Sequence, residues 1–153
     1  MNFKRIFDMD LVRETIADPD IYARLSDDGS PKREDFRPIE SELVHYIAAY
    51  DGGDYMGLWM FVPRNVICWE VHTCLLKRAW GRSVELARGC VAWIWANTSV
   101  QRIISEVPAN NPLALRLALK SGMTVFGTNE RSSLKNGELI DCTWVGISRP
   151  LEA

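Results

Sequence analysis

The sequence contains no long hydrophobic run and no excess of basic residues, and these two absences exclude broad classes of protein. Its longest apolar stretch covers residues 90–96, whereas a membrane-spanning helix needs roughly 20 apolar residues. Lysine and arginine number 18 against 20 aspartates and glutamates, which gives a net charge of -2. Non-specific nucleic-acid binders usually carry a clear basic excess. We therefore expect neither a membrane nor a nucleic acid as a partner.

The sequence also lacks the cysteine and histidine arrangements that bind metals. Histidine occurs twice, and His72 has no second pair of ligands beside it. The early basic residues are interrupted by Asp8 and Asp10 before any apolar region, so we expect no signal peptide. The cysteines have no C-x-x-C spacing and lie in apolar segments, and we interpret all of them as reduced core residues of a cytoplasmic, metal-free protein: Cys68, Cys74, Cys90 and Cys142.

The 153 residues are enough for one domain with a sizeable core, and we expect a single domain over 1–153. Hydrophobic periodicity, caps and turn residues predict its elements. The predicted order is strand 3–7, helix 11–16 capped by Asp10, helix 20–25, loop 26–37, strands 43–50, 55–62 and 66–74, helix 83–96, strand 100–107, helix 112–121 capped by Asn111, and a hairpin of strands 125–133 and 138–148 around Asn136-Gly137.

This order predicts an α+β (α/β/α-like) fold with a mixed, mostly antiparallel, twisted sheet. Strands 66–74 and 100–107 are joined by a helix, and such a crossover favours a right-handed unit with parallel strands. The last two strands form a C-terminal β-hairpin, because Asn-Gly is typical of a type I′ turn. If the two helix-linked strands were not parallel neighbours, the motifs described next would be chance matches in an unrelated α+β domain.

The turn before helix 83–96 is basic and contains a glycine. It reads Lys-Arg-Ala-Trp-Gly-Arg-Ser over residues 77–83. The start of a helix offers backbone N–H groups and a positive dipole end to an anion. Gly81 allows close approach of the backbone, and an arginine can hold a phosphate through two hydrogen bonds. The turn therefore predicts a site for a phosphate-bearing cofactor, with a simple surface cluster of basic residues as the alternative.

Two motifs together resemble the GCN5-related N-acetyltransferase (GNAT) superfamily, although the second is divergent. In that family a turn of pattern Gln/Arg-x-x-Gly-x-Gly/Ala holds the pyrophosphate of coenzyme A, and residues 78–83 match it with Ser83 in the last place. A later family motif reads Asn-x-x-Ala/Ser-x-x-x-Tyr-x-x-x-Gly-Phe. Asn111, Ala114 and Gly122 match the Asn, Ala and Gly of this motif. Ala118 stands at the position of its Tyr, and Met123 stands at the position of its Phe. The element order agrees over essentially the whole chain.

The resemblance implies a GNAT fold and acetyl-CoA (coenzyme A) as the cofactor. In the family the pantetheine arm pairs with the strand before the turn, which implies backbone contacts along residues 71–74, and the family Asn lies near the arm. Trp80 either covers the cofactor or packs under the turn. The implied cofactor-binding residues are Val71, Thr73, Cys74, Arg78, Ala79, Trp80, Gly81, Arg82, Ser83 and Asn111.

Acetylation of an amine requires a base, because an ammonium group of pKa ~10.4 must lose a proton. The candidates are Glu70, His72 and Glu106, with the first two on one face of one strand. An ion pair with arginine is the alternative role for Glu70, and a core position is the alternative for His72. In many family members the Tyr at the position of Ala118 protonates the departing thiolate. Tyr50, Tyr55 or water could replace it here.

The resemblance implies an acetyl-CoA-dependent N-acetyltransferase that moves the acetyl group directly to an amine of a small molecule or a protein. Residues 20–37 and 50–55 flank the acceptor side in the family, and acidic residues in the loop fit a cationic acceptor. The missing Tyr leaves an alternative, namely a catalytically degenerate GNAT-fold protein that acts as a CoA-binding or protein-interaction module, similar to small Trp-rich chains of bacteriophages. A monomer or a homodimer is expected.

Overall fold

Seven strands, four α-helices and two short 3-10 helices follow one another along residues 1–152, the part of the chain that this computed structural model describes. In chain order they are β1 (Asn2–Ile6), α1 (Met9–Ile16), α2 (Pro19–Leu25), η1 (Arg33–Asp35), β2 (His45–Asp51), β3 (Asp54–Pro63), β4 (Cys68–Leu75), η2 (Lys77–Arg82), α3 (Ser83–Asn97), β5 (Arg102–Pro108), α4 (Pro112–Lys120), β6 (Thr124–Lys135) and β7 (Glu138–Ser148).

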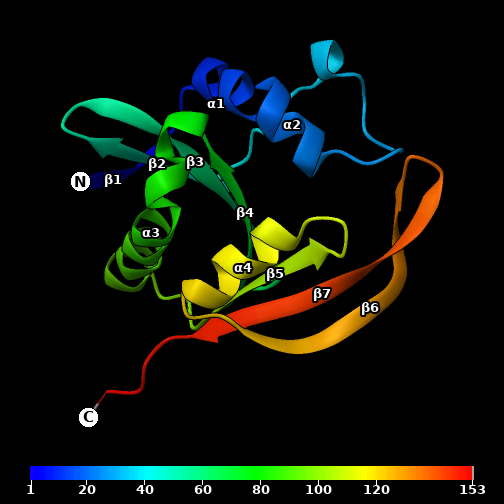
Figure 1. Ribbon diagram of the computed structural model, residues 1–153. Helices are drawn as coiled ribbons and strands as arrows, with labels where there is room; N and C mark the ends of the chain where they lie inside the picture. Colours follow the sequence, from blue (N-terminus) through cyan, green and yellow to red (C-terminus); the bar gives the residue numbers. More distant parts are fainter. Residues whose placement is uncertain (153) are drawn as a thin grey trace.

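All seven strands described in residues 1–152 belong to one sheet, in the order β1-β2-β3-β4-β5-β7-β6 (Figure 1). Neighbouring strands are antiparallel except β4 and β5, which are parallel and are connected by α3. The predicted α+β architecture, with one parallel pair and a C-terminal hairpin, is therefore confirmed. The parallel pair also removes the possibility that the two motifs are chance matches in an unrelated topology.

Helices cover both faces of the sheet. Alternation along β2 directs Ile47 and Ala49 toward α3 and α4, and Tyr46 and Ala48 toward α1 and α2. The sheet therefore separates two hydrophobic clusters, one on each face. Within residues 1–152 no helix has both the length and the hydrophobicity needed to cross a lipid bilayer.

Two local predictions need correction. Asp8, rather than Asp10, caps α1, because its carboxylate accepts hydrogen bonds from the backbone N–H groups of Asp10 and Leu11 at 3.1 and 3.2 Å. The basic turn forms the 3-10 helix η2 over residues 77–82, so some of the backbone N–H groups expected to face a phosphate are used within the turn. Its internal bonds use the N–H groups of Ala79 and Ser83, which donate to the carbonyls of Leu76 and Trp80.

The parallel strands β4 and β5 separate soon after they meet. Their register pairs run only from Cys68–Arg102 to Glu70–Ile104. Beyond this point the hydroxyl of Ser105 on β5 donates to the carbonyl of Val71 on β4 at 3.1 Å, where the next strand–strand bond would otherwise form. The rest of β4 pairs with β3 on one side and is open on the other.

Candidate active site

A cavity of about 590 Å³ lies where β4 and β5 separate. It is lined by residues from these strands, from α3 and α4, from the segment after α2 and from the β6–β7 hairpin. The structure brings many of the predicted site residues into this one cleft: Glu70, Val71, His72, Thr73, Trp80, Ser83, Glu106 and Asn111. Cavities of this size are typical of small-molecule sites.

The open edge of β4 presents backbone groups to the cleft. In a strand the N–H and C=O of one residue point to the same side, and this side alternates along the chain. Because the Val71 carbonyl meets Ser105 of β5, the backbone groups of Thr73 also face the cleft. Thr73 is exposed, and in residues 1–152 no strand pairs with it on this side. Thr73 thus offers one donor and one acceptor to an extended ligand.

Cys74 does not join this edge. By the same alternation its backbone groups point toward β3, where it pairs with Leu58. Its thiol is fully buried among the residues under α1 and α2. Burial raises the pKa of the Cys74 thiol to about 12. The structure therefore places this predicted cofactor contact in the hydrophobic core.

The first turn of α3 opens toward a second hollow on the surface. No side chain caps this helix. The Ser83 N–H already donates to the Trp80 carbonyl, so an anion would have to use the N–H groups that follow it in the first turn. Gly81 and Ser83 line the hollow together with three basic residues, Arg82, Arg88 and Lys120, and one acidic residue, Glu85. Arg88 also donates to the Lys120 carbonyl at 2.6 Å, which ties α3 to the end of α4. The arrangement fits a phosphate group.

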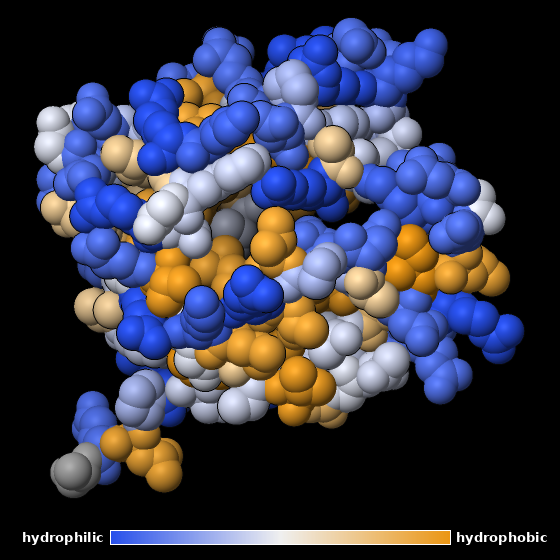
Figure 2. All heavy atoms as spheres, in the orientation of Figure 1, coloured by the Kyte–Doolittle hydropathy of each residue, from blue (hydrophilic) through white to orange (hydrophobic). Residues whose placement is uncertain are grey.

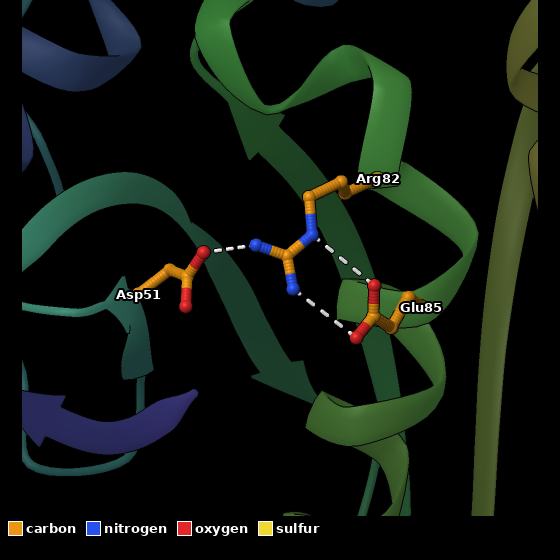
Figure 3. Close-up of polar contacts among 3 residues, drawn as sticks. All are labelled: Asp51, Arg82 and Glu85. Carbon is orange, nitrogen blue, oxygen red and sulfur yellow. Dashed lines mark hydrogen bonds and ion pairs between the residues drawn. The ribbon is translucent and has the colours of Figure 1, made fainter.

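Arg82 is not free to bind such a group in this structure. Its guanidinium forms an ion pair with Asp51 at the end of β2 and two hydrogen bonds of 3.2 Å with Glu85 (Figure 3). These two carboxylates raise the pKa of Arg82, the hydrogen bonds with Glu85 being the larger cause. Arg78 is exposed and lies in the same turn. Sequence reasoning missed Arg88, although it is the single basic residue of helix α3.

Trp80 packs at the far end of the open edge. Its indole N–H donates to the Leu75 carbonyl at 3.1 Å, so this last backbone acceptor of β4 is already occupied. The guanidinium carbon of Arg24, from α2, lies 4.4 Å from the ring centroid. Cation–π contacts of this kind hold the ring in place. Trp80 therefore closes one end of the cleft and leaves the backbone of Thr73 open.

Glu70, His72 and Glu106 share the face of the sheet that α1 and α2 cover. The His72 Nε2 atom lies 3.7 Å from a Glu70 carboxylate oxygen, and Glu70 also pairs with Arg64 at 3.4 Å. Glu106 accepts hydrogen bonds of 3.3 Å from Asn129 and Ser132. Burial lowers the pKa of His72, against the opposing influence of both carboxylates. The imidazole is therefore neutral near pH 7 and able to accept a proton.

This environment makes a prediction about both histidines. Burial also lowers the pKa of His45, assisted by Arg5. We expect both rings to titrate below their ordinary value of 6.5. Because the unfolded chain then binds more protons, the free energy of unfolding should fall as pH drops below 6.5. NMR titration of the ring protons, with a His45→Gln variant to assign the His72 signals, measures this. A His72 pKa above 6.5 would contradict it.

The remaining predicted residues have clear structural roles. The Asn111 side chain caps α4, accepting a hydrogen bond from the Ala114 N–H at 3.2 Å, and Asn111 also lines the cleft. Ala118 lines the cleft as well but offers no proton. Tyr55, proposed as its replacement, bonds instead to Thr15 at 2.7 Å and packs against Tyr50 with the two rings tilted by 52°. Both phenols lie in the cluster under α1 and α2. Within residues 1–152 no three potential ligands are grouped to hold a metal ion.

Comparison with solved structures identifies the fold. A spermidine N-acetyltransferase from Vibrio cholerae, in complex with CoA and spermine, superposes with a TM-score of 0.78 at 15% identity, covering 96% of this chain and 94% of that one. A putative phosphinothricin N-acetyltransferase gives 0.73 at 17% identity, covering 98% and 99%. A ribosomal-protein-alanine N-acetyltransferase from Brucella melitensis gives 0.69 at 13% identity, covering 97% and 100%.

These structural neighbours are acetyltransferases of the GNAT family, and the chain has the GNAT fold. The similarity extends over nearly the whole length of each protein. No family model matches the sequence, and no curated protein sequence matches it. The fold is therefore shared with these enzymes at a level of sequence identity that leaves the chemistry to be argued from the site.

Proposed function

We propose that this protein is an acetyl-CoA-dependent N-acetyltransferase that transfers the acetyl group directly to an amine. One observation carries the proposal. A single cleft contains the open backbone edge at Thr73, lies beside the uncapped start of α3, and holds a neutral imidazole, His72, between two carboxylates. These are the parts that binding a phosphate-bearing thioester and deprotonating an amine require.

The cleft fits coenzyme A in two places. The Thr73 N–H and C=O provide the pairing that an amide-containing arm needs, and the first turn of α3, with Arg78, Arg88 and Lys120 nearby, provides for the phosphates. When bound, acetyl-CoA supplies the activated acetyl group as a thioester. A backbone N–H at the open edge stabilises the negative charge that develops on the carbonyl oxygen.

His72 acts as the base in this proposal. The acceptor arrives as an ammonium ion and gives one proton to the His72 imidazole, and the free amine forms the new C–N bond as the C–S bond breaks. Glu70 and Glu106 stabilise the imidazolium. The sulfur leaves with the electron pair of the C–S bond. Since Ala118 cannot donate a proton, the thiolate takes one from water, and the hydroxide that remains takes the second proton from the nitrogen of the new amide. His72 then returns its proton to solvent, so that the net products are the amide, the thiol and one proton.

An amine acceptor is supported by the comparisons and by the two carboxylates beside His72. The Vibrio cholerae neighbour is a spermidine N-acetyltransferase bound to spermine. In this chain the cavity is lined by three carboxylates, Glu70, Glu106 and Asp27, and by four basic side chains, Arg24, Arg116, Lys120 and Lys135. Glu70 and Glu106 are the carboxylates that act on His72. Asp28, expected to attract a cationic acceptor, instead binds two backbone N–H groups of the β6–β7 hairpin.

A proline at Thr73 tests the cofactor site directly. Thr73→Pro removes the N–H that faces the cleft, and proline is tolerated at an open strand edge. We expect acetyl-CoA affinity to fall by at least about tenfold, the equivalent of one lost hydrogen bond of ~1.5 kcal/mol. Isothermal titration calorimetry with acetyl-CoA and with CoA measures the change.

Thr73→Ala is the matched control, because it removes the exposed side chain and keeps the backbone N–H. Its affinity for acetyl-CoA should stay within about twofold of the parent protein. If neither ligand binds the folded parent protein at high concentration, the proposed function is wrong. If Thr73→Pro binds as tightly as Thr73→Ala, the cofactor does not use this edge of β4.

A second candidate function, a CoA-binding or protein-interaction module without catalysis, is favoured by two features. Ala118 occupies the position of the family Tyr, and Arg82 of the phosphate turn is held by Asp51 and Glu85. Acetyl-CoA binding without acetylation of any amine in a broad screen would support this candidate over the enzyme.

A further inference from the structure

The tip of the β6–β7 hairpin is fastened to the segment that follows α2. We call this contact the clasp and define it as residues 23–28 together with residues 134–137. In Figure 1 the hairpin rises away from the rest of the sheet and its tip meets the segment after α2. The two parts of the clasp are more than 100 positions apart in the sequence, so their contact is a feature of the tertiary structure.

Five hydrogen bonds hold the clasp together. The Lys135 ammonium donates to the carbonyls of Ala23 and Ser26, at 2.6 and 2.5 Å, at the C-terminal end of α2, where a cation is favourable. The Asp28 carboxylate accepts from the N–H groups of Asn136 and Gly137, each at 2.8 Å. The Asp28 N–H donates to the carbonyl of Leu134 at 2.9 Å.

The clasp lies across the acceptor end of the cleft. Ser26, Asp27 and Lys135 of the clasp line the same cavity as His72 and its carboxylates. The view in Figure 2 shows polar residues surrounding a hollow above the hydrophobic side chains that gather over α4. The cavity of about 590 Å³ must hold both the arm of the cofactor and the acceptor. While the clasp is closed, an amine carried on a protein would have to enter past the hairpin tip and the segment after α2.

The charge beneath the clasp fits a cation. Glu106 is half-buried, and its hydrogen-bond partners in residues 1–152 are the neutral side chains of Asn129 and Ser132. Its charge has no cationic partner within ion-pair distance in this part of the chain, whereas Glu70 is paired with Arg64. A partly buried carboxylate without a cation is costly, and an ammonium group would offset this cost.

We propose that the clasp restricts the acceptor to a small cationic amine that is free in solution, and that it excludes amines carried on folded proteins. This inference rests on the proposed acetyltransferase function and narrows its substrate class. Asp28 and Lys135 are the residues that determine this specificity, since their side chains provide four of the five bonds.

The native cysteines allow a test that needs no known acceptor. Cys142 lines the cavity and is buried, Cys68 is half-buried outside it, and Cys74 lies in the core on the α1 and α2 face. The probe is a maleimide attached by a short linker to a small folded carrier protein, and mass spectrometry measures the labelling rate of each cysteine. The variant is Asp28→Asn with Lys135→Met. The control, Glu40→Gln with Lys32→Met, makes similar changes at exposed residues outside the clasp.

We expect the clasp variant to raise the Cys142 labelling rate by about tenfold or more relative to the parent, because labelling follows local opening. The control should leave the rate unchanged, and Cys68 provides the reference rate in each protein. Equal Cys142 rates in the parent and the clasp variant overturn the proposal. Cys74 reports unfolding, because it lies in the core. If Cys74 is labelled as fast as Cys142 in the clasp variant, the experiment is repeated with Lys135→Met alone. An unchanged Cys142 labelling rate in Lys135→Met likewise overturns the proposal.

A second arm tests the acceptor class with spermidine, free or coupled through one end to the same carrier protein. With acetyl-CoA, the parent should acetylate the free amine at least about tenfold faster, and the clasp variant should reduce this preference. Equal rates for both forms in the parent overturn the proposal. Failure of the parent to bind acetyl-CoA by calorimetry refutes the enzymatic function instead, and the Cys142 result then still decides whether the clasp closes the cleft.

Discussion

Replacing His72 with glutamine is expected to lower kcat/KM for acetyl transfer by about 10²–10⁴, the usual contribution of a general base. Glutamine keeps a polar group of similar reach, but it cannot accept a proton near pH 7. The affinity for acetyl-CoA should stay nearly constant, because the His72 backbone groups point toward β3 rather than toward the cleft. Steady-state kinetics with an amine acceptor, combined with calorimetry for acetyl-CoA, separates these two effects.

The two carboxylates provide matched comparisons for this result. Glu70→Gln and Glu106→Gln each keep the size of the side chain and remove one charge that stabilises the His72 imidazolium. Each change should reduce kcat/KM by about tenfold or less, since it removes one electrostatic contribution and leaves the base in place. A loss in Glu106→Gln as large as that in His72→Gln would instead identify Glu106 as the base. Full activity in His72→Gln would exclude the imidazole from the reaction.

Much of the fold could be predicted because its determinants are local. Helix-linked strands, caps and the Asn136-Gly137 turn are visible in short stretches of sequence, and they were enough to predict the parallel β4–β5 pair and the hairpin. The start of α1 was misplaced, because Asp8 and Asp10 are both good caps and their spacing alone does not distinguish them.

The site was predictable where it depends on strand alternation. Glu70 and His72 share a face because they are two residues apart, and Glu106 joins them through the parallel register. Alternation also determines which backbone groups reach the open edge. Alternation would have separated Thr73 from Cys74, because neighbouring residues direct their backbone groups to opposite sides of the strand. To say which of the two faces the cleft, however, one must know on which side of β4 the strand β5 lies.

Contacts between distant segments could not be read from the sequence. Arg82 resembled a phosphate ligand, yet its partner Asp51 lies 31 positions away on another hairpin. The clasp depends on bonds between residues 108 and 109 positions apart. Asp28 looked like an exposed acidic residue of a loop, and only the tertiary structure shows that its carboxylate binds the hairpin tip. The role of such a side chain can be assigned only when the tertiary structure shows its partner.

Replacing Gly57 with valine is expected to destabilise the protein by roughly 4 kcal/mol, near the upper end of single-residue effects. Gly57 has a φ of +123°, which side-chain-bearing residues rarely adopt. A Cβ atom there would collide with the Cys74 carbonyl oxygen and would lie 2.8 Å from the Leu75 Cα atom. Both are backbone atoms in the β3–β4 ladder, so the clash cannot be relieved by turning a side chain. Chemical denaturation of the purified variant measures the loss.

Gly52 allows the cost of a positive φ to be separated from the cost of the backbone clash. It also has a positive φ, +58°, but a Cβ atom there would meet nothing within 4 Å. Gly52→Ala should therefore cost about 1 kcal/mol, the price of the backbone conformation alone. If Gly57→Ala costs no more than Gly52→Ala, the close approach of β3 to the end of β4 is not tight. A larger cost for Gly57→Ala means that this contact fixes the end of β4, and with it the open edge at Thr73 and the turn into η2. Acetyl-CoA affinity should then fall in Gly57→Ala even where the variant remains folded, and it should be retained in Gly52→Ala.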